Sequence, residues 1–406
     1  MILFAHPFGN ANVRAVLNAL QEANQLARFL TTVGYSKRAP FLSFLPKSAG
    51  RRAYDLPAQK IRAYPAREMV RLLAGALRIP VRHEHGWASI DQVWAALDGK
   101  AARYLSANKQ QEQIGAVYAY EDCALRSFTA ARALGVRRIY DLPIAYYETA
   151  QRILREEAER YPDWEPTLGG TRDSKEKLAR KKRELELAEL VICPSNFVLD
   201  SLPERARQEK QCVMAPFGSP VSATKSAPSK SSAPLRVLFA GALTQRKGLA
   251  DLFAAMRLID SANVELVVMG SLLRPLSWYR EQFPNFRYEP PRPHGEVLRL
   301  MGTCDVFVLP SLVEGRALVQ QEAMASGLPL IATRNAGGDD LIEDGETGFL
   351  VPIRSPEALA EKINWCAGHR ERICGMGIAA QRRAAQLSWR GYGETILAAI
   401  QALTGI

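Results

Sequence analysis

Short apolar runs alternate with longer stretches of helical periodicity along almost the whole chain. The short runs are bounded by polar or turn residues, which is typical of strands buried on both faces of a sheet. In the longer stretches apolar positions recur every three to four residues and predict helices. The predicted strands are 1–7, 114–120, 138–142, 190–194, 212–216, 235–240, 264–270, 305–310, 328–333 and 348–352. The predicted helices are 12–30, 122–134, 144–160, 172–188, 248–258, 294–301, 317–326 and 356–367.

One stretch interrupts this alternation. Residues 219–234 consist of Ser, Ala, Pro and Lys with almost no large apolar side chain, the composition of a linker. Alternating strands and helices favour parallel sheets covered on both faces. The pattern therefore predicts two doubly wound α/β domains, 1–218 and 235–386, followed by a helical segment, 387–406. Ligands of such sheets bind in the loops after the carboxyl ends of the strands, so two facing domains would enclose a cleft.

Composition narrows the class of protein. The chain has 406 residues, of which 47% are hydrophobic, and this excludes a disordered or collagen-like protein. Its apolar runs are shorter than a bilayer-spanning helix requires. The first eight residues lack a basic leader and a cleavage site, so we interpret them as a strand rather than a signal peptide. We expect a cytoplasmic protein, either free or peripheral on the cytoplasmic face of a membrane.

The net charge of +11 calls for an anionic partner, such as nucleic acid, a membrane surface or a phosphorylated substrate. The excess is concentrated between Lys37 and Arg82, where the acidic residues are Asp55 and Glu68. A solvated basic face is the structural alternative. The same segment contains an apolar cluster, Phe41, Leu42, Phe44 and Leu45. Cations beside apolar residues predict docking on an anionic membrane; if the cluster is buried, the cations would instead attract an anionic soluble acceptor.

Two carboxylates follow the strand predicted at 305–310. Glu314 and Gly315 precede a helix that begins near Ala317 and ends at Gly327. Free backbone N–H groups at a helix N-terminus favour oxygen-rich or anionic ligands. Glu322 lies farther along the helix, so the two carboxylates suit a ligand with hydroxyl groups at both ends. Taken singly, either residue also fits a loop charge or an exposed helix position.

Two cations follow the first strand of the second domain. Gly241 lets the backbone approach a ligand, and Arg246 and Lys247 stand at the start of the next helix. Cations are unfavourable at a helix N-terminus, and a bound diphosphate would remove that conflict. A solvated loop is the alternative. The chain has neither a Walker A sequence nor G-x-G-x-x-G, and Asp339-Asp340 after Gly337-Gly338 is not a metal motif, so no metal is assigned.

Together these motifs resemble the retaining glycosyltransferases of family 4. The resemblance rests on E-G-x-x-L-V-x-x-E-A-M-A-x-G-L-P at Glu314, G-x5-K-G at Gly241 and E-D-G-x-T-G-F-L-V-P at Glu343, and it is dense across 235–355. It implies the GT-B fold, with the last helix crossing back to the first domain. It also implies a nucleotide-diphosphate sugar donor, a glycan, lipid-linked or protein acceptor, and no metal cofactor. By position Glu314 would contact the donor sugar, Glu322 the ribose and Lys247 the diphosphate. Further donor contacts would come from Gly9, Asn10, Gly241, Gly315, Arg316, Ala317 and Leu318.

Three departures from the family pattern define further candidates. The usual Gly-Arg is Gly241-Ala242, so we expect Arg246 to supply the second cation. The usual double glycine of the first loop is Gly9-Asn10. The family often has a His after its fourth strand, where this chain has Glu121-Asp122. One of these carboxylates would replace that His, with Glu121 as the catalytic candidate; a favourable charge at a helix N-terminus is the alternative.

Two more residues of the first domain are acceptor-side candidates with Asp122. His6 follows the first strand in a loop that faces the cleft, and Asn12 follows it closely. A packed strand-end histidine and a helix N-cap are the respective alternatives. Two other function classes also remain. A GT-B sugar-nucleotide epimerase would bind the same donor, and a basic nucleic-acid-binding protein would bind any polyanion, although the sequence shows no such module.

Overall fold

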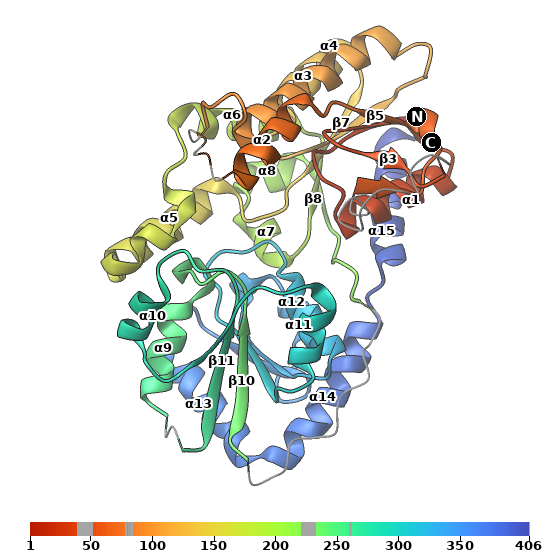
Figure 1. Cartoon of the computed structure of the whole chain (residues 1–406). Coiled ribbons are helices and arrows are strands. Elements are labelled where there is room, and N and C mark those ends of the chain that lie inside the picture. The colour runs from red at the N-terminus through yellow and green to blue at the C-terminus, as the bar shows by residue number, and fades with distance from the viewer. Residues whose placement is uncertain are drawn as a thin grey trace.

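The structure, a computed structural model, describes residues 1–38, 52–77, 79, 81, 84–220, 233–259 and 262–405. It consists of two α/β domains, each built on a parallel sheet with helices on both faces (Figure 1). The predicted fold class, two doubly wound domains, is confirmed.

A seven-stranded parallel sheet forms the first domain, in the order β5-β2-β1-β6-β7-β8-β9. Its central strands are buried on both faces, as their continuous apolar runs predict. A separate two-stranded sheet pairs β3 (Tyr35–Ser36) with β4 (Ala53–Tyr54). The strands of the main sheet are β1 (Ile2–Ala5), β2 (Leu26–Thr31), β5 (Ile61–Ala63), β6 (Ala116–Tyr120), β7 (Arg137–Asp141), β8 (Leu190–Cys193) and β9 (Gln211–Met214).

The helices of the first domain cover both faces of this sheet. They are α1 (Ala11–Glu22), α2 (Ala66–Ala76), α3 (Ile90–Asn108), α4 (Leu125–Ala133), α5 (Tyr147–Arg160), α6 (Lys175–Leu187), α7 (Asn196–Ser201) and α8 (Glu204–Glu209).

The second domain has a six-stranded parallel sheet in the order β12-β11-β10-β13-β14-β15. Its strands are β10 (Leu235–Ala240), β11 (Val264–Met269), β12 (Arg287–Glu289), β13 (Val306–Leu309), β14 (Leu330–Thr333) and β15 (Gly348–Val351). Its helices are α9 (Leu249–Arg257), α10 (Leu276–Gln282), α11 (His294–Met301), α12 (Leu318–Ala325), α13 (Pro356–Gly368) and α14 (Arg370–Ala385).

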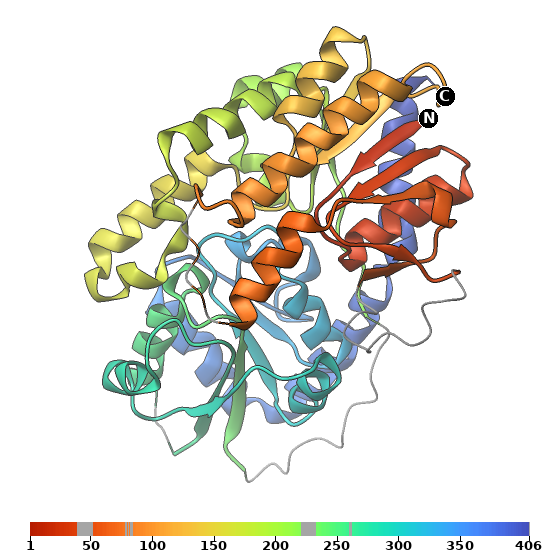
Figure 2. The same cartoon turned by 45° about the horizontal axis from the view of Figure 1, so that its top comes forward.

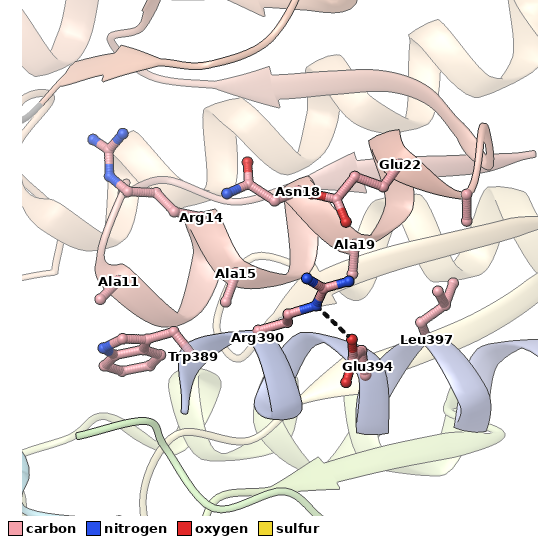
Figure 3. Close-up of a pocket in the computed structure, with 11 residues that line it drawn as sticks. Ala11, Arg14, Ala15, Asn18, Ala19, Glu22, Trp389, Arg390, Glu394 and Leu397 are labelled. Carbon is pink, nitrogen blue, oxygen red and sulfur yellow. Dashed lines mark hydrogen bonds and ion pairs between the residues drawn. The ribbon is translucent and has the colours of Figure 1, made fainter. Parts of the chain in front are cut away.

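The last helix, α15 (Trp389–Thr404), leaves the second domain and packs along α1 and the sheet of the first domain (Figure 1). The two helices approach closely at Gly393, which has no side chain; a Cβ there would overlap the backbone of Ala15. Along one side of this contact runs a groove of about 480 Å³, where the ion pair of Arg390 and Glu394 faces the small residues of α1 (Figure 3). None of the predicted donor-site residues lines the groove.

The helix predicted at 12–30 is wrong in its second half. The helix ends at Glu22, and Leu26–Thr31 forms the buried strand β2. Asn24 lies between them in the left-handed region, with φ of 54°, and stops the helix. The apolar residues after it continued the helical spacing by coincidence, so periodicity alone did not show the boundary.

Several other elements were not predicted. The strands β5 and β12 have three residues each and lie at sheet edges, too short to give a period. The helices α2, α3, α7, α8, α10 and α14 were also not predicted and fill stretches left without a prediction.

A short segment that follows α5 belongs to the core of the second domain. Trp164 lies in the 3-10 helix η4 (Pro162–Thr167) and packs edge-on against Phe253, Trp278 and Tyr279, with ring centroids 4.8–6.0 Å apart. The two domains are therefore joined by side-chain packing in addition to the chain connections.

Candidate active site

The predicted site residues lie at the switch points of the two sheets. In the first sheet the strand order reverses between β1 and β6, and the loops after them contain His6–Asn10 and Glu121-Asp122. In the second sheet it reverses between β10 and β13, whose loops contain Gly241–Lys247 and Glu314–Ala317. Ligands of open α/β sheets bind in the crevice at such points.

In the second domain two cations share one carboxylate. The Nζ atom of Lys247 lies 2.5 Å from Oε1 of Glu314, and Nη1 of Arg246 lies 3.0 Å from the same oxygen. The Arg246 guanidinium also donates to the carbonyl of Val313 at 2.7 Å. Burial opposes ionisation of Glu314, but the neighbouring Lys247 and Arg246 outweigh it and hold its pKa below the usual value. The group therefore carries a net positive charge at neutral pH.

Two glycines, Gly241 and Gly248, allow the loop after β10 to fold tightly. Gly241 has φ of 154°, and a Cβ there would lie 2.8 Å from Cδ of Lys247. Gly248 ends the 3-10 helix η6 (Gln245–Lys247) in the left-handed region, and a side chain there would overlap the carbonyl of Pro310. Gly241, which was predicted to let the backbone approach a ligand, thus also leaves space for the side-chain carbons of Lys247.

Residues of the first half of the chain hold the same loop from the other side. Thr244 Oγ1 donates to the carbonyl of Thr167 at 2.6 Å, and the N–H of Gln245 donates to Thr167 Oγ1 at 3.1 Å. The Gln245 amide donates to Glu157 at 2.6 Å and to Asp251 at 2.8 Å. All these groups are buried, so the residues directly before Arg246 are fixed by contacts between domains.

The loop after β13 touches the first domain at Gly315. A side chain there would overlap the carbonyl of Pro143, and Ser195 Oγ donates to the Gly315 carbonyl at 2.6 Å. Ser195 was not among the candidate residues predicted from the sequence. The glycine at 315 is required by this interdomain contact, and its donor contact stays a prediction.

The side chain of Arg316 is fully buried, and its nitrogen atoms are engaged by residues of the second domain. It forms a bidentate ion pair with Asp340 at 2.6 and 3.0 Å and donates to Gln321 at 3.1 Å. Any donor contact of Arg316 therefore falls on its backbone. Ala317 is buried and Leu318 half-buried, and α12 begins at Leu318, near the predicted start.

Glu322 lies in the middle of α12 and remains partly accessible. Its carboxylate lies 3.6 Å from Nδ1 of His294, the first residue of α11. Burial raises the pKa of Glu322, and His294 offsets part of the rise. From the sequence His294 had no assigned role, because nothing local connects it with a carboxylate 28 positions away. The structure makes His294 a further candidate residue beside Glu322.

In the first domain Glu121 and Asp122 belong to a buried ion-pair cluster. Lys181 of α6 lies 2.9 Å from Glu121 and 3.0 Å from Asp122, and Arg180 lies 2.8 Å from Asp122. Burial raises the pKa of Glu121, with Lys181 acting against it, whereas Lys181 and Arg180 outweigh burial and lower the pKa of Asp122. Both carboxylates lie after β6 as predicted, but each already has a cationic partner.

The loop after β1 is more closely packed than the sequence suggested. His6 is fully buried, accepts from the N–H of Phe8 at 3.1 Å, and has its pKa lowered to about 3 by burial. A side chain at Gly9 would overlap the hydroxyl of Tyr54. Its neighbour Asn10 is exposed. The neutral ring of His6 can donate or accept a hydrogen bond but does not carry charge at neutral pH.

The N-cap interpretation of Asn12 is wrong. The N-cap of α1 is Asn10, whose side chain makes no capping hydrogen bond. The side chain of Asn12 hydrogen-bonds to Tyr392 of α15. Tyr392 also lies close to Tyr118, which in turn lies close to the buried Asp141, so polar side chains meet where the last helix packs on the sheet.

The residues that the structure describes contain neither a metal-binding cluster nor a membrane-spanning helix. Among them no three His, Cys, Asp or Glu side chains are grouped closely enough to hold a metal ion. Within the same ranges no helix is long and apolar enough to cross a membrane. The apolar cluster predicted to meet a membrane, Phe41 to Leu45, lies outside the described residues, as do Lys47 and Arg51 of the basic stretch around it.

Comparison with known proteins gives a family for the second domain. Residues 234–369 match the family described as "Glycosyl transferases group 1", so the chain contains a glycosyltransferase group 1 domain. Over 148 residues the chain is 31% identical to a putative colanic acid biosynthesis glycosyltransferase, WcaL, of Salmonella typhimurium. That match covers 32% of this chain and 35% of WcaL, and the chain spans only about a third of the length of the curated relatives it matches first.

Solved structures extend the likeness to both domains. Sucrose-phosphate synthase from Thermosynechococcus elongatus is 18% identical, with a TM-score of 0.65 over 99% of this chain and 98% of that one. Anabaena HepE in complex with UDP-glucose is also 18% identical, with a TM-score of 0.61 over 99% of both chains. At such identities the likeness shows the fold alone, and that fold is the expected GT-B arrangement.

Proposed function

We propose that this chain is a retaining glycosyltransferase of family 4. It would move a hexosyl or N-acetylhexosaminyl group from a nucleoside diphosphate sugar to an acceptor hydroxyl in glycan or glycoconjugate biosynthesis. The observation that carries the proposal is the group formed by Arg246, Lys247 and Glu314. It lies at the switch point of a domain that matches glycosyl transferases group 1.

The charge of this group suits a sugar diphosphate. Lys247 and Arg246 bind the diphosphate, while Glu314 accepts hydrogen bonds from the donor sugar. Because Glu314 holds both cations before the donor arrives, little reorganisation is needed when negative charge develops on the leaving group. Glu322 receives the ribose hydroxyls, beside His294. The amides that begin α12 and the loop at Gly9 complete the donor contacts.

In the proposed reaction the acceptor oxygen attacks the anomeric carbon from the face on which the diphosphate leaves. The new carbon–oxygen bond forms as the bond to the diphosphate breaks, and a diphosphate oxygen takes the acceptor proton. No general base is then required. Neutralisation by Lys247 and Arg246 takes the place of a metal ion, so the reaction needs no cofactor.

The first domain supplies the acceptor side. Glu121 stands where related enzymes carry a His, and its ion pair with Lys181 holds it in place for a catalytic contact. His6, Asn12 and Asp122 lie in or beside the same two loops. We take a glycan, a lipid-linked sugar or a protein as the acceptor and exclude nucleic acid. The name of WcaL supports a role in polysaccharide synthesis, and the HepE complex makes UDP-sugars the first donors to test.

The test is a transfer assay with UDP-, GDP- and ADP-sugars and a panel of glycan and lipid-linked acceptors. We expect one donor to release its nucleoside diphosphate only with an acceptor, to give a product of unchanged anomeric configuration by NMR, and to react equally well with EDTA. Interconversion of the donor without acceptor would show an epimerase instead. Inversion at the anomeric carbon would contradict the retaining mechanism.

A further inference from the structure

In α2 the usual arrangement of a surface helix is reversed, because a charged side chain is buried and the large apolar side chains are exposed. Its buried large side chain is Glu68, which is 1% exposed and pairs with Arg71 at 2.7 Å and Arg52 at 3.0 Å. Otherwise only Ala74 is buried among its residues. Burial of a carboxylate requires such pairing, so this polar contact fixes which face of the helix points inward.

The outward face of α2 is apolar. Met69, Leu72, Leu73 and Leu77 recur at the spacing of one helical stripe, and their exposed fractions are 53%, 41%, 59% and 61%. Exposed apolar residues continue beyond the helix at Ile79, Val81, Trp87 and Ile90. With Val70 they make up nine of the fourteen large apolar side chains that are exposed among the described residues. Such a concentration of exposed apolar side chains within residues 69–90, called the α2 patch below, marks an interaction surface.

The patch is also basic. Residues 52–77 contain five Lys or Arg and two acidic residues. Both acidic side chains are neutralised, Glu68 by Arg52 and Arg71, and Asp55 by Arg38. Arg62, in the strand β5 that precedes the helix, is exposed and lies over the rings of Tyr64 and Tyr104 at 5.9 and 5.7 Å. Arg67 lies over the ring of the exposed Trp87 at 4.8 Å. A tryptophan beside a cation at the rim of an apolar surface suits a membrane–water interface.

We propose that α2 docks this protein on an anionic lipid bilayer, with Met69, Leu72, Leu73 and Leu77 entering the interface and Arg62 and Arg67 facing the headgroups. A second copy of the chain would bring like charges together at the rim, so a bilayer fits the patch better. Figure 2 shows α2, in orange, at the front of the molecule with no other helix or strand in front of it. The surface differs from the cluster at Phe41–Leu45 that the sequence suggested, and it does not depend on the proposed enzymatic activity.

The test is co-sedimentation of the full chain with phosphatidylcholine vesicles, either neutral or containing phosphatidylglycerol. We expect binding to the anionic vesicles that weakens with added salt. The double variant Met69→Gln, Leu73→Gln should bind at least tenfold more weakly, because two side chains can no longer be buried. Arg62→Gln should cost about fivefold, the effect of one near-surface charge. All replaced side chains are exposed, so thermal stability should not change.

Two matched variants serve as controls. Ile378→Gln removes an apolar side chain of similar exposure (48%) from α14, and Arg205→Gln removes an exposed cation from α8. Neither should alter vesicle binding. Equal losses in the controls, equal binding to neutral and anionic vesicles, or unchanged binding of the α2 variant would each overturn the proposal. So would a concentration-dependent dimer that only the α2 substitutions dissociate, because α2 would then bind a second copy.

Discussion

Glu314 determines how the two cations of the site are held. With its pKa lowered by Lys247 and Arg246, it stays ionised at neutral pH and keeps both cations at one point. A donor diphosphate would bring more negative charge than this single carboxylate, so the cations would gain interactions on binding rather than lose them. Each cation can therefore be tested separately, because the other still partners Glu314 when one is removed.

Lys247→Ala should lower turnover by about a hundredfold or more, because the lysine stabilises charge that grows on the leaving diphosphate. Its effect on the melting temperature should be small, since Arg246 continues to pair with Glu314. Steady-state kinetics and thermal denaturation measure the two effects. Lys362→Ala, on the outer helix α13, is the control. Turnover within twofold of wild type would show that Lys247 is an ordinary loop cation.

Glu322→Gln should weaken binding of the nucleoside diphosphate by about 1–3 kcal/mol, the value of a lost hydrogen bond to a charged acceptor. Titration calorimetry with the diphosphate alone measures this directly. Glu361→Gln replaces an exposed carboxylate on α13 and should leave the affinity unchanged. An unaltered affinity in Glu322→Gln would remove this residue from the donor site.

Long or strongly patterned elements could be predicted from the sequence, and elements defined by distant contacts could not. The central strands are continuous apolar runs, and α12 ends at Ala325, two residues before Gly327, whose φ of 81° stops the helix as the glycine indicated. The two loops that contain the candidate donor residues could be predicted because their residues lie close together in sequence. By contrast, η4 packs into a core formed some 90 residues later, and the interdomain contact of Gly315 with Pro143 spans 172 positions. Such contacts leave no local signal.

Thr167→Val tests whether η4 positions the cations. Valine has nearly the same shape but leaves the buried N–H of Gln245 without its acceptor, which should cost about 1–3 kcal/mol of stability. We also expect lower turnover, because Gln245 lies two residues before Lys247 and helps to fix its position. Thr129→Val removes an exposed hydroxyl on α4 and should change neither property. If stability falls but turnover stays at the wild-type value, η4 stabilises the fold and does not position the cations.

The stability of the whole protein should depend on pH through the buried carboxyl group of Asp141, which lies under α15. Burial raises the pKa of Asp141 to about 7, with the neighbouring Tyr118 acting against the rise. Between about pH 4 and 7 the folded protein thus holds a proton that the unfolded chain releases, so stability falls as the pH rises through this range. The effect of Asp141 is at most about 4 kcal/mol. Glu184, with its pKa raised to about 8, acts in the same direction.

Thermal denaturation between pH 5 and 8 measures this dependence. The melting temperature should fall with rising pH, and Asp141→Asn should reduce the slope because asparagine does not titrate. Glu361→Gln should keep the wild-type slope. A melting temperature that rises over this range would show that Asp141 is ionised throughout.

In the proposed mechanism a nucleoside diphosphate binds between the domains at Arg246 and Lys247. Titration calorimetry of UDP, GDP and ADP with wild type, Arg246→Gln, Lys247→Ala and Lys362→Ala tests it most directly. We predict that one of the three ligands binds wild type with a stoichiometry of one. Its affinity should fall at least tenfold in Arg246→Gln and in Lys247→Ala, and stay unchanged in Lys362→Ala. Binding of none of the three, or equal affinity in all four proteins, would contradict it.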